Sequence, residues 1–226
     1  MIMVSYISSG ELLYTVIVPV YNEAENVRKF MLNLKKHAEN ILAVDDGSTD
    51  GSAEILKSIG VRVIEHGSNM GKGAAVLTGI KAARTEDIIL IDGDGQFSPS
   101  EIPLFTEKLK ECDLVLGNRF HEGLEMPFHR LVANKLLKFL LSRALGINDP
   151  LIGFRALKRS KFLKLHEKGF EHDLEMIFLS REKGLKVCEV PVSVSYKIKK
   201  SSSPAGVMRK FFYYAKLLYY ALRRAY

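Results

Sequence analysis

Residues 88–96 read Ile-Ile-Leu-Ile-Asp-Gly-Asp-Gly-Gln, an apolar run that ends in two carboxylates one residue apart. The apolar run is typical of a buried strand, and the Gly and Asp residues are typical of the turn that follows. Such a strand would hold Asp92 and Asp94 on a rigid edge and direct both toward one point. Because neighbouring anions repel each other, the pair predicts a cation between them, and hard oxygen ligands favour Mg²⁺ or Mn²⁺. The alternative is an ordinary strand-end turn without a ligand.

Strands and helices alternate through the first half of the chain. Short apolar runs predict strands at residues 14–20, 41–44, 61–64, 87–91 and 114–116. Helices are expected from Glu23, over 52–59, over 71–83 and from about Ser100. This alternation predicts an α/β fold, a mostly parallel sheet flanked by helices on both faces. Ligands of such sheets bind at the carboxyl ends of the strands, so Tyr21, Asp46 and Asp92 are expected to meet at one edge.

The second half of the chain is less regular. Its expected elements are a basic amphipathic helix over 128–145, a strand over 151–157, a helix over 172–183, a strand over 187–194 and a long aromatic and basic helix over 207–226. A chain of 226 residues is long enough to bury one large core and to carry an extension.

The cysteines and the start of the chain bear on location. Cys112 and Cys188 are far apart and have no metal-binding or redox spacing. They predict a reducing compartment and no chemical role for either thiol. The first 13 residues lack a basic region and a long apolar stretch, so no signal peptide is expected. No run approaches the roughly 18 apolar residues of a spanning helix, and the predicted location is the cytoplasm.

Positive charge is concentrated at the end of the chain. From Val190 to Tyr226 there are eight Lys and Arg residues and no Asp or Glu, whereas the whole chain has a net charge of +7. The remaining residues therefore sum to −1. A second window without acidic residues spans 126–148 and includes Arg130. This segregation predicts an anionic partner, which could be nucleic acid, anionic lipid or a phosphorylated substrate.

The helix expected over 207–226 has two unlike faces. Arg209, Lys216 and Arg223 recur every seven residues and share one face, while Phe and Tyr side chains fall largely on another. Such a helix suits the headgroup boundary, where each basic residue contributes about 1 kcal/mol near an anionic surface. We expect peripheral contact with the cytoplasmic face of a membrane, or with a separate membrane subunit. The alternative is an aromatic face that packs on the body of the protein or on a second subunit.

Six segments follow one another in a recognisable order. They are 16–23 (Val-Ile-Val-Pro-Val-Tyr-Asn-Glu), 44–51 (Val-Asp-Asp-Gly-Ser-Thr-Asp-Gly), 69–75 (Asn-Met-Gly-Lys-Gly-Ala-Ala), 92–96 (Asp-Gly-Asp-Gly-Gln), 117–120 (Gly-Asn-Arg-Phe) and 149–155 (Asp-Pro-Leu-Ile-Gly-Phe-Arg). Together they resemble the GT-A glycosyltransferases of family 2, and most of all the synthases of dolichol- or polyprenyl-phosphate sugars. The resemblance implies a catalytic domain over 1–203, which leaves 204–226 as the membrane-interface helix.

This resemblance implies an inverting, metal-dependent transfer of a hexose from a nucleotide-diphosphate sugar to dolichyl or polyprenyl phosphate. It implies Mg²⁺ or Mn²⁺ as the ion, with Asp94 and Gln96 as its ligands. The catalytic residues it implies are Asp92, Asp94 and Arg119. Nucleotide-sugar binding is implied for Pro19, Tyr21, Glu23, Val44, Asp46, Lys72, Asp92 and Gly93. Contact with the acceptor phosphate is expected from Arg119, Arg130, Arg155, Lys197 and Lys199.

Lys72 has two interpretations. The run Gly71-Lys72-Gly73 superficially resembles a P-loop, but the spacing from Gly67 is one residue short and Gly73 stands where Ser or Thr is required. The family resemblance places Lys72 near the nucleotide. The alternative is a solvated lysine at the start of a helix.

The acceptor determines what catalysis requires. A hydroxyl acceptor needs a general base, and Glu171, Asp173 and Glu175 are the candidates, unless they only form a solvated helix face. A lipid phosphate has a second pKa of about 6 and is already largely a dianion at neutral pH, so it needs cations instead. The surplus of cations favours the phosphate. The alternative is a soluble GT-A enzyme that acts on a saccharide or protein hydroxyl.

Two departures from the family pattern leave the donor open between GDP-mannose and UDP-glucose types. Residues 196–203 stand where the family has Arg-x-x-Gly-x-Ser-Lys, with Lys197 or Lys199 in place of the arginine, and Gly95 replaces a leucine common in mannosyl enzymes. A nucleotidyltransferase would need a basic Gly-rich loop near the first strand, which the chain lacks. No nucleic-acid recognition motif is present, so no nucleic-acid partner is expected.

Overall fold

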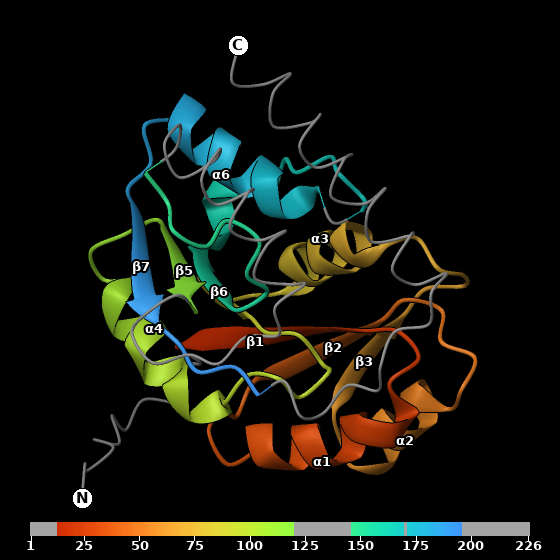
Figure 1. The fold of residues 1–226 in the computed structure, drawn as a ribbon. Coiled ribbons are helices and arrows are strands. Elements are labelled where there is room, and N and C mark those ends of the chain that lie inside the picture. The colour runs from red at the N-terminus through yellow and green to blue at the C-terminus, as the bar shows by residue number, and fades with distance from the viewer. Residues whose placement is uncertain (1–12, 120–145, 170, 196–226) are drawn as a thin grey trace, which may run out of the picture.

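The computed structural model describes residues 13–119, 146–169 and 171–195. Within these ranges, seven strands form one sheet with the order β3-β2-β1-β4-β6-β5-β7 (Figure 1). The strands are β1 (Tyr14–Val20), β2 (Ile41–Asp45), β3 (Arg62–Glu65), β4 (Asp87–Leu90), β5 (Leu114–Asn118), β6 (Arg155–Lys158) and β7 (Val187–Pro191). Only β6 runs antiparallel to its neighbours, β4 and β5. The predicted mostly parallel sheet is therefore confirmed.

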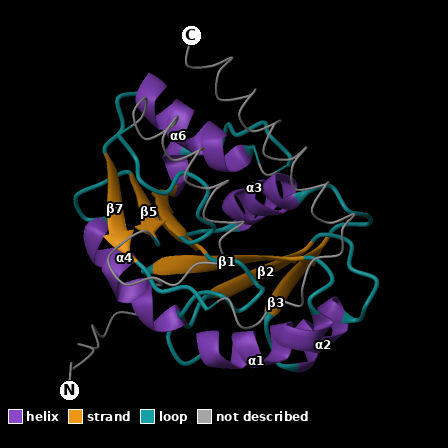
Figure 2. Ribbon diagram, viewed as in Figure 1, coloured by secondary structure: helices purple, strands orange, loops and turns teal. Residues whose placement is uncertain are grey.

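Helices cover both faces of the sheet, as the sequence predicted. The α-helices are α1 (Ala24–Leu34), α2 (Ser52–Ser58), α3 (Lys72–Ala82), α4 (Ile102–Lys108) and α6 (His172–Glu182), and the short 3-10 helices are η1 (Pro99–Glu101) and η2 (Arg159–Lys161). Figure 2 shows α1, α2 and α4 on one side of the sheet and α3 and α6 on the other. The result is a three-layer α/β/α arrangement.

The core follows from the apolar pattern of the elements. Helix α1 buries Val27, Phe30, Met31 and Leu34, which recur at helical spacing on one face. The central strands are apolar on both faces, and every residue of β2 is buried. Burying one Val, Leu, Ile, Phe or Met side chain contributes roughly 1.5–3 kcal/mol. The central strands are therefore held rigidly, and the turns at their carboxyl ends start from fixed points.

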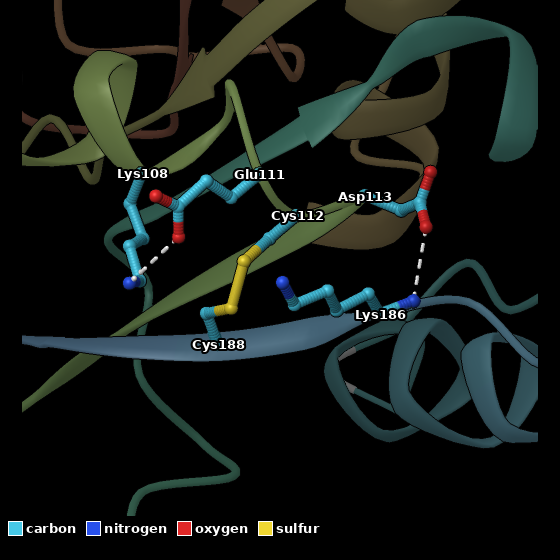
Figure 3. The surroundings of a disulfide bond; sticks show 6 residues. All are labelled: Lys108, Glu111, Cys112, Asp113, Lys186 and Cys188. Carbon is cyan, nitrogen blue, oxygen red and sulfur yellow. Dashed lines mark hydrogen bonds and ion pairs between the residues drawn. A yellow bond between two sulfur atoms is a disulfide. The ribbon is translucent and has the colours of Figure 1, made fainter.

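The prediction that neither cysteine thiol has a chemical role is wrong. Cys112 and Cys188 form a disulfide, although they are separated by 76 residues in the sequence. Because β5 and β7 are neighbouring parallel strands, the fold brings the two Cα atoms to 6.2 Å, which is within the usual span of a disulfide. Figure 3 shows the bond between Cys112, two residues before β5, and Cys188 in β7, next to the hydrogen bond from the Lys186 backbone N–H to the Asp113 carboxylate. Spacing along the sequence gave no sign of this proximity.

Several predicted features lie outside the described residues. They are the basic helix over 128–145 with Arg130, the segment with Lys197 and Lys199, the domain boundary at 203 and the helix over 207–226. None of the helices in the described ranges has the length and apolar character that crossing a bilayer requires.

Candidate active site

The expected polar residues meet at one edge of the sheet. The Asp46 backbone N–H donates to the Val20 carbonyl at 2.8 Å, and the Ile91 N–H donates to the Ile17 carbonyl at 3.2 Å. The ends of β2, β1 and β4 are thereby held in register, with Tyr21, Asp46 and Asp92 following them. Strand β6 runs the other way, so the turn before it, residues 149–154, reaches the same edge.

The cation beside Asp92 is Lys72. The Lys72 Nζ lies 2.7 Å from Asp92 Oδ1, and the two side chains are 17% and 27% exposed. Burial opposes the charge on Lys72, but the Asp92 and Asp173 carboxylates outweigh this effect and hold the pKa of Lys72 above its ordinary value. Lys72 is therefore a charged group inside the site, and the alternative of a solvated lysine is wrong.

A glycine on the 149–154 turn makes room for the Asp92 carboxylate. A β-carbon placed on Gly153 would overlap both carboxylate oxygens of Asp92. Any other residue at this position would displace Asp92 or the turn. Gly153 therefore lets the end of β4 and the turn before β6 pack closely around a charged group.

Asp94 and Gln96 lie on the turn between β4 and η1. Asp94 Oδ1 accepts the Gln96 backbone N–H at 3.1 Å, and both residues are half-buried. The strand segment after β7 supports this turn, because the Ser195 N–H donates to the Gln96 carbonyl at 2.8 Å and Val194 pairs with Phe97. The turn is thus tethered from two parts of the chain.

The donor set of this turn fits a hard divalent cation. A carboxylate and a side-chain amide oxygen are ligands that Mg²⁺ accepts, and Mg²⁺ commonly retains positions for substrate phosphates. Within the described ranges, no group of three or more His, Cys, Asp or Glu side chains could hold a metal by itself. An ion at Asp94 and Gln96 would have coordination positions open to oxygens of a bound substrate.

Arg119, at the end of β5, is held in a two-pronged ion pair. Its Nε lies 2.6 Å from Asp149 Oδ2, and its Nη2 lies 3.1 Å from Asp149 Oδ1. Nη2 also donates to the Leu151 carbonyl at 3.2 Å. Asp149 is buried and Arg119 is 15% exposed on its side chain. The pair fixes the planar guanidinium at the edge of the site.

Arg155 was predicted to contact the acceptor phosphate, but the structure buries it. It is 1% exposed, and it donates to the carbonyls of Ile152, Asp173 and Pro150 at 2.6, 2.7 and 2.9 Å. Its Nη2 also lies 3.0 Å from Asp173 Oδ1. These contacts engage all three guanidinium nitrogens. In this arrangement Arg155 shapes the turn before β6, and it does not belong among the acceptor contacts.

The three carboxylates at the start of α6 are buried and engaged. Glu175 accepts the backbone N–H groups of His166 and Glu167, each with a bond of 2.9 Å. Glu171 is 4% exposed and lies against Gly169, where a β-carbon would overlap its carboxylate. The alternative of a solvated helix face is therefore wrong for these residues.

Asp173 is the partner of the buried Arg155. Burial works against its charge, yet the Arg155 guanidinium, with smaller contributions from His172, Lys72 and Arg119, keeps the pKa of Asp173 below its usual range. His172 is also buried, and burial lowers its pKa in spite of the neighbouring Asp173 carboxylate. Its Nδ1 lies 2.8 Å from the Gly169 carbonyl, which gives it a structural contact.

The residues predicted to hold the nucleotide differ in exposure. Tyr21 is 46% exposed, whereas Val44 is fully buried in β2. Pro19 and Glu23 are half-buried. Gly93 packs against the end of β1, where a β-carbon would lie 3.2 Å from the Pro19 carbonyl oxygen. Tyr21 is therefore the one of these side chains best placed to stack on a base.

Asp46 is buried and connects the end of β2 to the loop before α3. Its Oδ1 accepts the Met70 N–H at 2.9 Å, and its Oδ2 accepts the Gly71 N–H at 2.8 Å. His66, which sequence reasoning missed, places Nδ1 at 2.7 Å from Asp46 Oδ1. No motif indicated His66, because the contact joins residues 20 apart that meet only through the parallel pairing of β2 with β3.

A mostly parallel sheet with helices on both faces and carboxylates at its carboxyl edge is the arrangement of a GT-A glycosyltransferase. Residues 15–165 match the family described as Glycosyl transferase family 2, which is more than half of the chain. The chain belongs to this family and is a glycosyltransferase.

Relatives extend this assignment. An uncharacterized protein of Methanocaldococcus jannaschii is 33% identical over 218 residues, which cover 90% of this chain and 90% of that protein. The UDP-N-acetylglucosamine–dolichyl-phosphate N-acetylglucosaminyltransferase of Methanococcus voltae is 28% identical, with 93% and 96% covered. The dolichol-phosphate mannosyltransferase of Pyrococcus furiosus is 28% identical, with 91% of this chain and 62% of that enzyme covered.

A solved structure resembles the fold. The glucosyl-3-phosphoglycerate synthase of Mycobacterium tuberculosis, in complex with Mn²⁺, UDP-glucose and phosphoglyceric acid, superimposes with a TM-score of 0.77. The match covers 96% of this chain and 80% of that one at 18% sequence identity. At this identity, the likeness supports the fold alone.

Proposed function

We propose that the chain transfers a hexose, with inversion, from a nucleotide-diphosphate sugar of the GDP-mannose or UDP-glucose type to dolichyl or polyprenyl phosphate. Family membership supports the glycosyl transfer. The names of the Methanococcus and Pyrococcus relatives support a dolichyl-phosphate acceptor. The choice of acceptor rests on one observation, that the candidate general bases of α6 are already bound by other residues of the protein.

The carboxylates that a hydroxyl acceptor would need are engaged in structural contacts. Glu175 holds two backbone N–H groups, and Asp173 is paired with Arg155. A carboxylate whose pKa lies below its usual range is a weak general base, which is the situation of Asp173. A phosphate dianion needs no base, so this arrangement favours a phosphate over a hydroxyl acceptor.

The donor would lie across the carboxyl edge of the sheet. Tyr21 offers an exposed ring for the base, and Lys72 offers a charge for the diphosphate. Mg²⁺ or Mn²⁺ would be held by Asp94 and Gln96, and when bound it would neutralise negative charge on the departing diphosphate. The Mn²⁺ and UDP-glucose bound by the Mycobacterium enzyme are consistent with this use of the fold.

The transfer exchanges one bond at the anomeric carbon for another. A phosphate oxygen of the acceptor attacks that carbon from the face opposite the nucleotide. The bond from the carbon to the diphosphate oxygen breaks, and its electron pair leaves with the nucleoside diphosphate. Lys72 is placed to stabilise the charge that develops on the leaving group, because a preorganised cation needs little rearrangement during the reaction.

The acceptor phosphate would meet cations on the side of the β5 end and the segment after β7. Arg119 lies at the end of β5, held by Asp149. Ser195, at the end of the described residues, donates its N–H to the Gln96 carbonyl at 2.8 Å. Arg130, Lys197 and Lys199 lie outside the described residues and stay proposed acceptor contacts. The basic segment 204–226 would hold the enzyme at the cytoplasmic face of a membrane, directly or through a separate subunit.

The direct test compares two lipids that differ by one phosphate. Labelled GDP-mannose, UDP-glucose and UDP-N-acetylglucosamine are each incubated with Mn²⁺ or Mg²⁺ and detergent-dispersed polyprenyl phosphate, or with polyprenol of the same length. We expect label in the organic phase with polyprenyl phosphate and at least one donor, and none with polyprenol. Transfer to polyprenol or to a soluble saccharide, without transfer to polyprenyl phosphate, would establish the hydroxyl-acceptor alternative.

A further inference from the structure

The loop between β3 and α3 is fastened by a buried side chain that the reaction outlined above does not use. His66 Nδ1 lies 2.7 Å from Asp46 Oδ1, and His66 Nε2 lies 2.9 Å from the Thr78 hydroxyl. The His66 side chain is 8% exposed and that of Asp46 is 4% exposed. One imidazole therefore joins the end of β2, the end of β3 and the second turn of α3.

Asp46 links His66 to the backbone of the loop through hydrogen bonds. Its two oxygens accept the N–H groups of Met70 and Gly71 in addition to the His66 contact. A carboxylate offers about four acceptor positions, and the described residues occupy three. The remaining position is on Oδ2, in a side chain that is 4% exposed. The His66 contact fixes the orientation of the carboxylate and hence the direction of that position.

The same loop positions Lys72 beside Asp92. Gly71 has a φ of +99°, which favours glycine, and Lys72 is the next residue and the first of α3. Gly47 packs so closely on this loop that a β-carbon there would overlap the backbone of Ser68 and Asn69. With the backbone fixed on both sides, the Lys72 Nζ is held 2.7 Å from Asp92 Oδ1.

We infer that His66 is a positioning residue for glycosyl transfer. By bonding Asp46 and Thr78 at once, it fixes the 66–71 loop, and so it sets the place of Lys72 beside Asp92. This role rests on the proposed function, in which Lys72 contacts the diphosphate of the donor. Without His66, the donor would still reach Lys72, but it would have to order the loop on binding.

Three variants separate the contacts. His66→Phe keeps a ring of similar size and removes both hydrogen bonds. His66→Asn retains an N–H near the Nδ1 position and so preserves the Asp46 contact alone. Thr78→Val keeps the shape of the threonine and removes only the hydroxyl. The matched control is His166→Asn, because the His166 side chain is 82% exposed.

Three measurements follow each variant: amide hydrogen exchange at Met70 and Gly71, binding of GDP and UDP with Mn²⁺, and the separate KM for donor and kcat. For His66→Phe we expect exchange to accelerate about tenfold or more, and nucleotide affinity to fall about tenfold, with donor KM rising in parallel and kcat falling less. His66→Asn should recover much of the affinity, Thr78→Val should show a smaller loss, and His166→Asn should match the wild type.

Two results would overturn the inference. One is unchanged exchange at Met70 and Gly71 in His66→Phe. The other is faster exchange with nucleotide affinity and kinetics equal to the wild type, which would reduce His66 to a structural role. A wild-type chain that binds no nucleoside diphosphate would instead overturn the proposed function, and the positioning role with it. That outcome is distinguishable because it appears before any residue is changed.

Discussion

Two groups of carboxylates on the same side of this molecule have opposite surroundings. Asp92 and Asp94 follow β4 on a Gly-rich turn, where Asp92 keeps 27% of its side chain exposed and Asp94 is half-buried. Asp173 and Glu175 lie in the first turn of α6 and are 3% exposed as residues, with Arg155 and loop N–H groups around them. The first group is accessible to a ligand, and the second is buried and bound by other residues of the protein.

The difference shows that residue type does not define a catalytic carboxylate. Both groups have two acids within three residues, and both lie near Lys72. In the α6 group, backbone N–H donors bind Glu175, and the buried Arg155 guanidinium outweighs burial and keeps the pKa of Asp173 below its usual range. The turn after β4 instead leaves oxygen ligands at an edge where substrate phosphates can complete a metal site. The following changes test this distinction.

The largest effect is expected from Asp173→Asn. This change leaves the 1%-exposed Arg155 without its charged partner, and breaking a buried ion pair typically costs about 3–5 kcal/mol. Chemical denaturation should therefore show a large loss in the free energy of unfolding. The fraction that stays folded should retain turnover. Wild-type stability with abolished turnover would instead identify Asp173 as a general base and contradict the distinction.

The next effect concerns catalysis. Asp94→Asn should reduce kcat by roughly 100- to 1000-fold, as expected for loss of a group that stabilises developing charge. The free energy of unfolding should change little, because Asp94 is only half-buried. Steady-state kinetics with Mn²⁺ would measure the loss.

The control for Asp94→Asn is Glu107→Gln, which neutralises a carboxylate that is 74% exposed on α4. Its kinetics should equal those of the wild type. Equal losses in the two variants would show that the assay responds to net charge, and the role assigned to Asp94 would not stand.

A smaller effect is expected at the far edge of the sheet. Replacing Cys112 and Cys188 by alanine removes a bond that joins β5 to β7, and such losses typically cost about 2–4 kcal/mol. Turnover at temperatures well below unfolding should persist, because the active edge is formed by other contacts. Thermal unfolding with and without reductant gives the same comparison in the wild type. A reductant-insensitive transition would show that the bond contributes nothing.

The smallest effect is a pH dependence. Burial lowers the pKa of His172 in the folded protein, so the unfolded chain binds a proton more readily. Stability should therefore fall as pH decreases through about 6.5, the ordinary value for histidine. His172→Asn keeps a donor for the Gly169 carbonyl and should flatten this decline. An equally steep decline in the variant would assign it to other groups.

Much of the fold could be predicted from the sequence, because the apolar runs are short, rich in β-branched residues and separated by helical patterns. The strand expected over 151–157 begins only at Arg155. Its apolar start, Leu151 and Ile152, forms a turn whose carbonyls accept hydrogen bonds from Arg119 and Arg155. Local pattern cannot distinguish an apolar turn held by buried guanidinium groups from a strand.

The residues of the site that follow strand ends could be predicted from the sequence. The contacts between side chains that are distant in the sequence could not. The edge that gathers Asp46, Asp92 and Asp94 follows from parallel strands. The ion pair between Lys72 and Asp92 does not follow from the sequence, because these residues are 20 apart and meet only through the packing of α3 on the sheet. The Asp46–His66 contact and the disulfide could not be predicted for the same reason.

The most direct test of the account is a single binding measurement on two variants. Calorimetric titration of GDP and UDP in the presence of Mn²⁺ is performed on Asp94→Asn and Asp173→Asn, both held at a temperature where each is folded. We expect Asp94→Asn to lose the metal-dependent part of nucleotide binding and Asp173→Asn to keep it. Retained binding in Asp94→Asn, together with its loss in folded Asp173→Asn, would show that the roles of the two carboxylates are reversed.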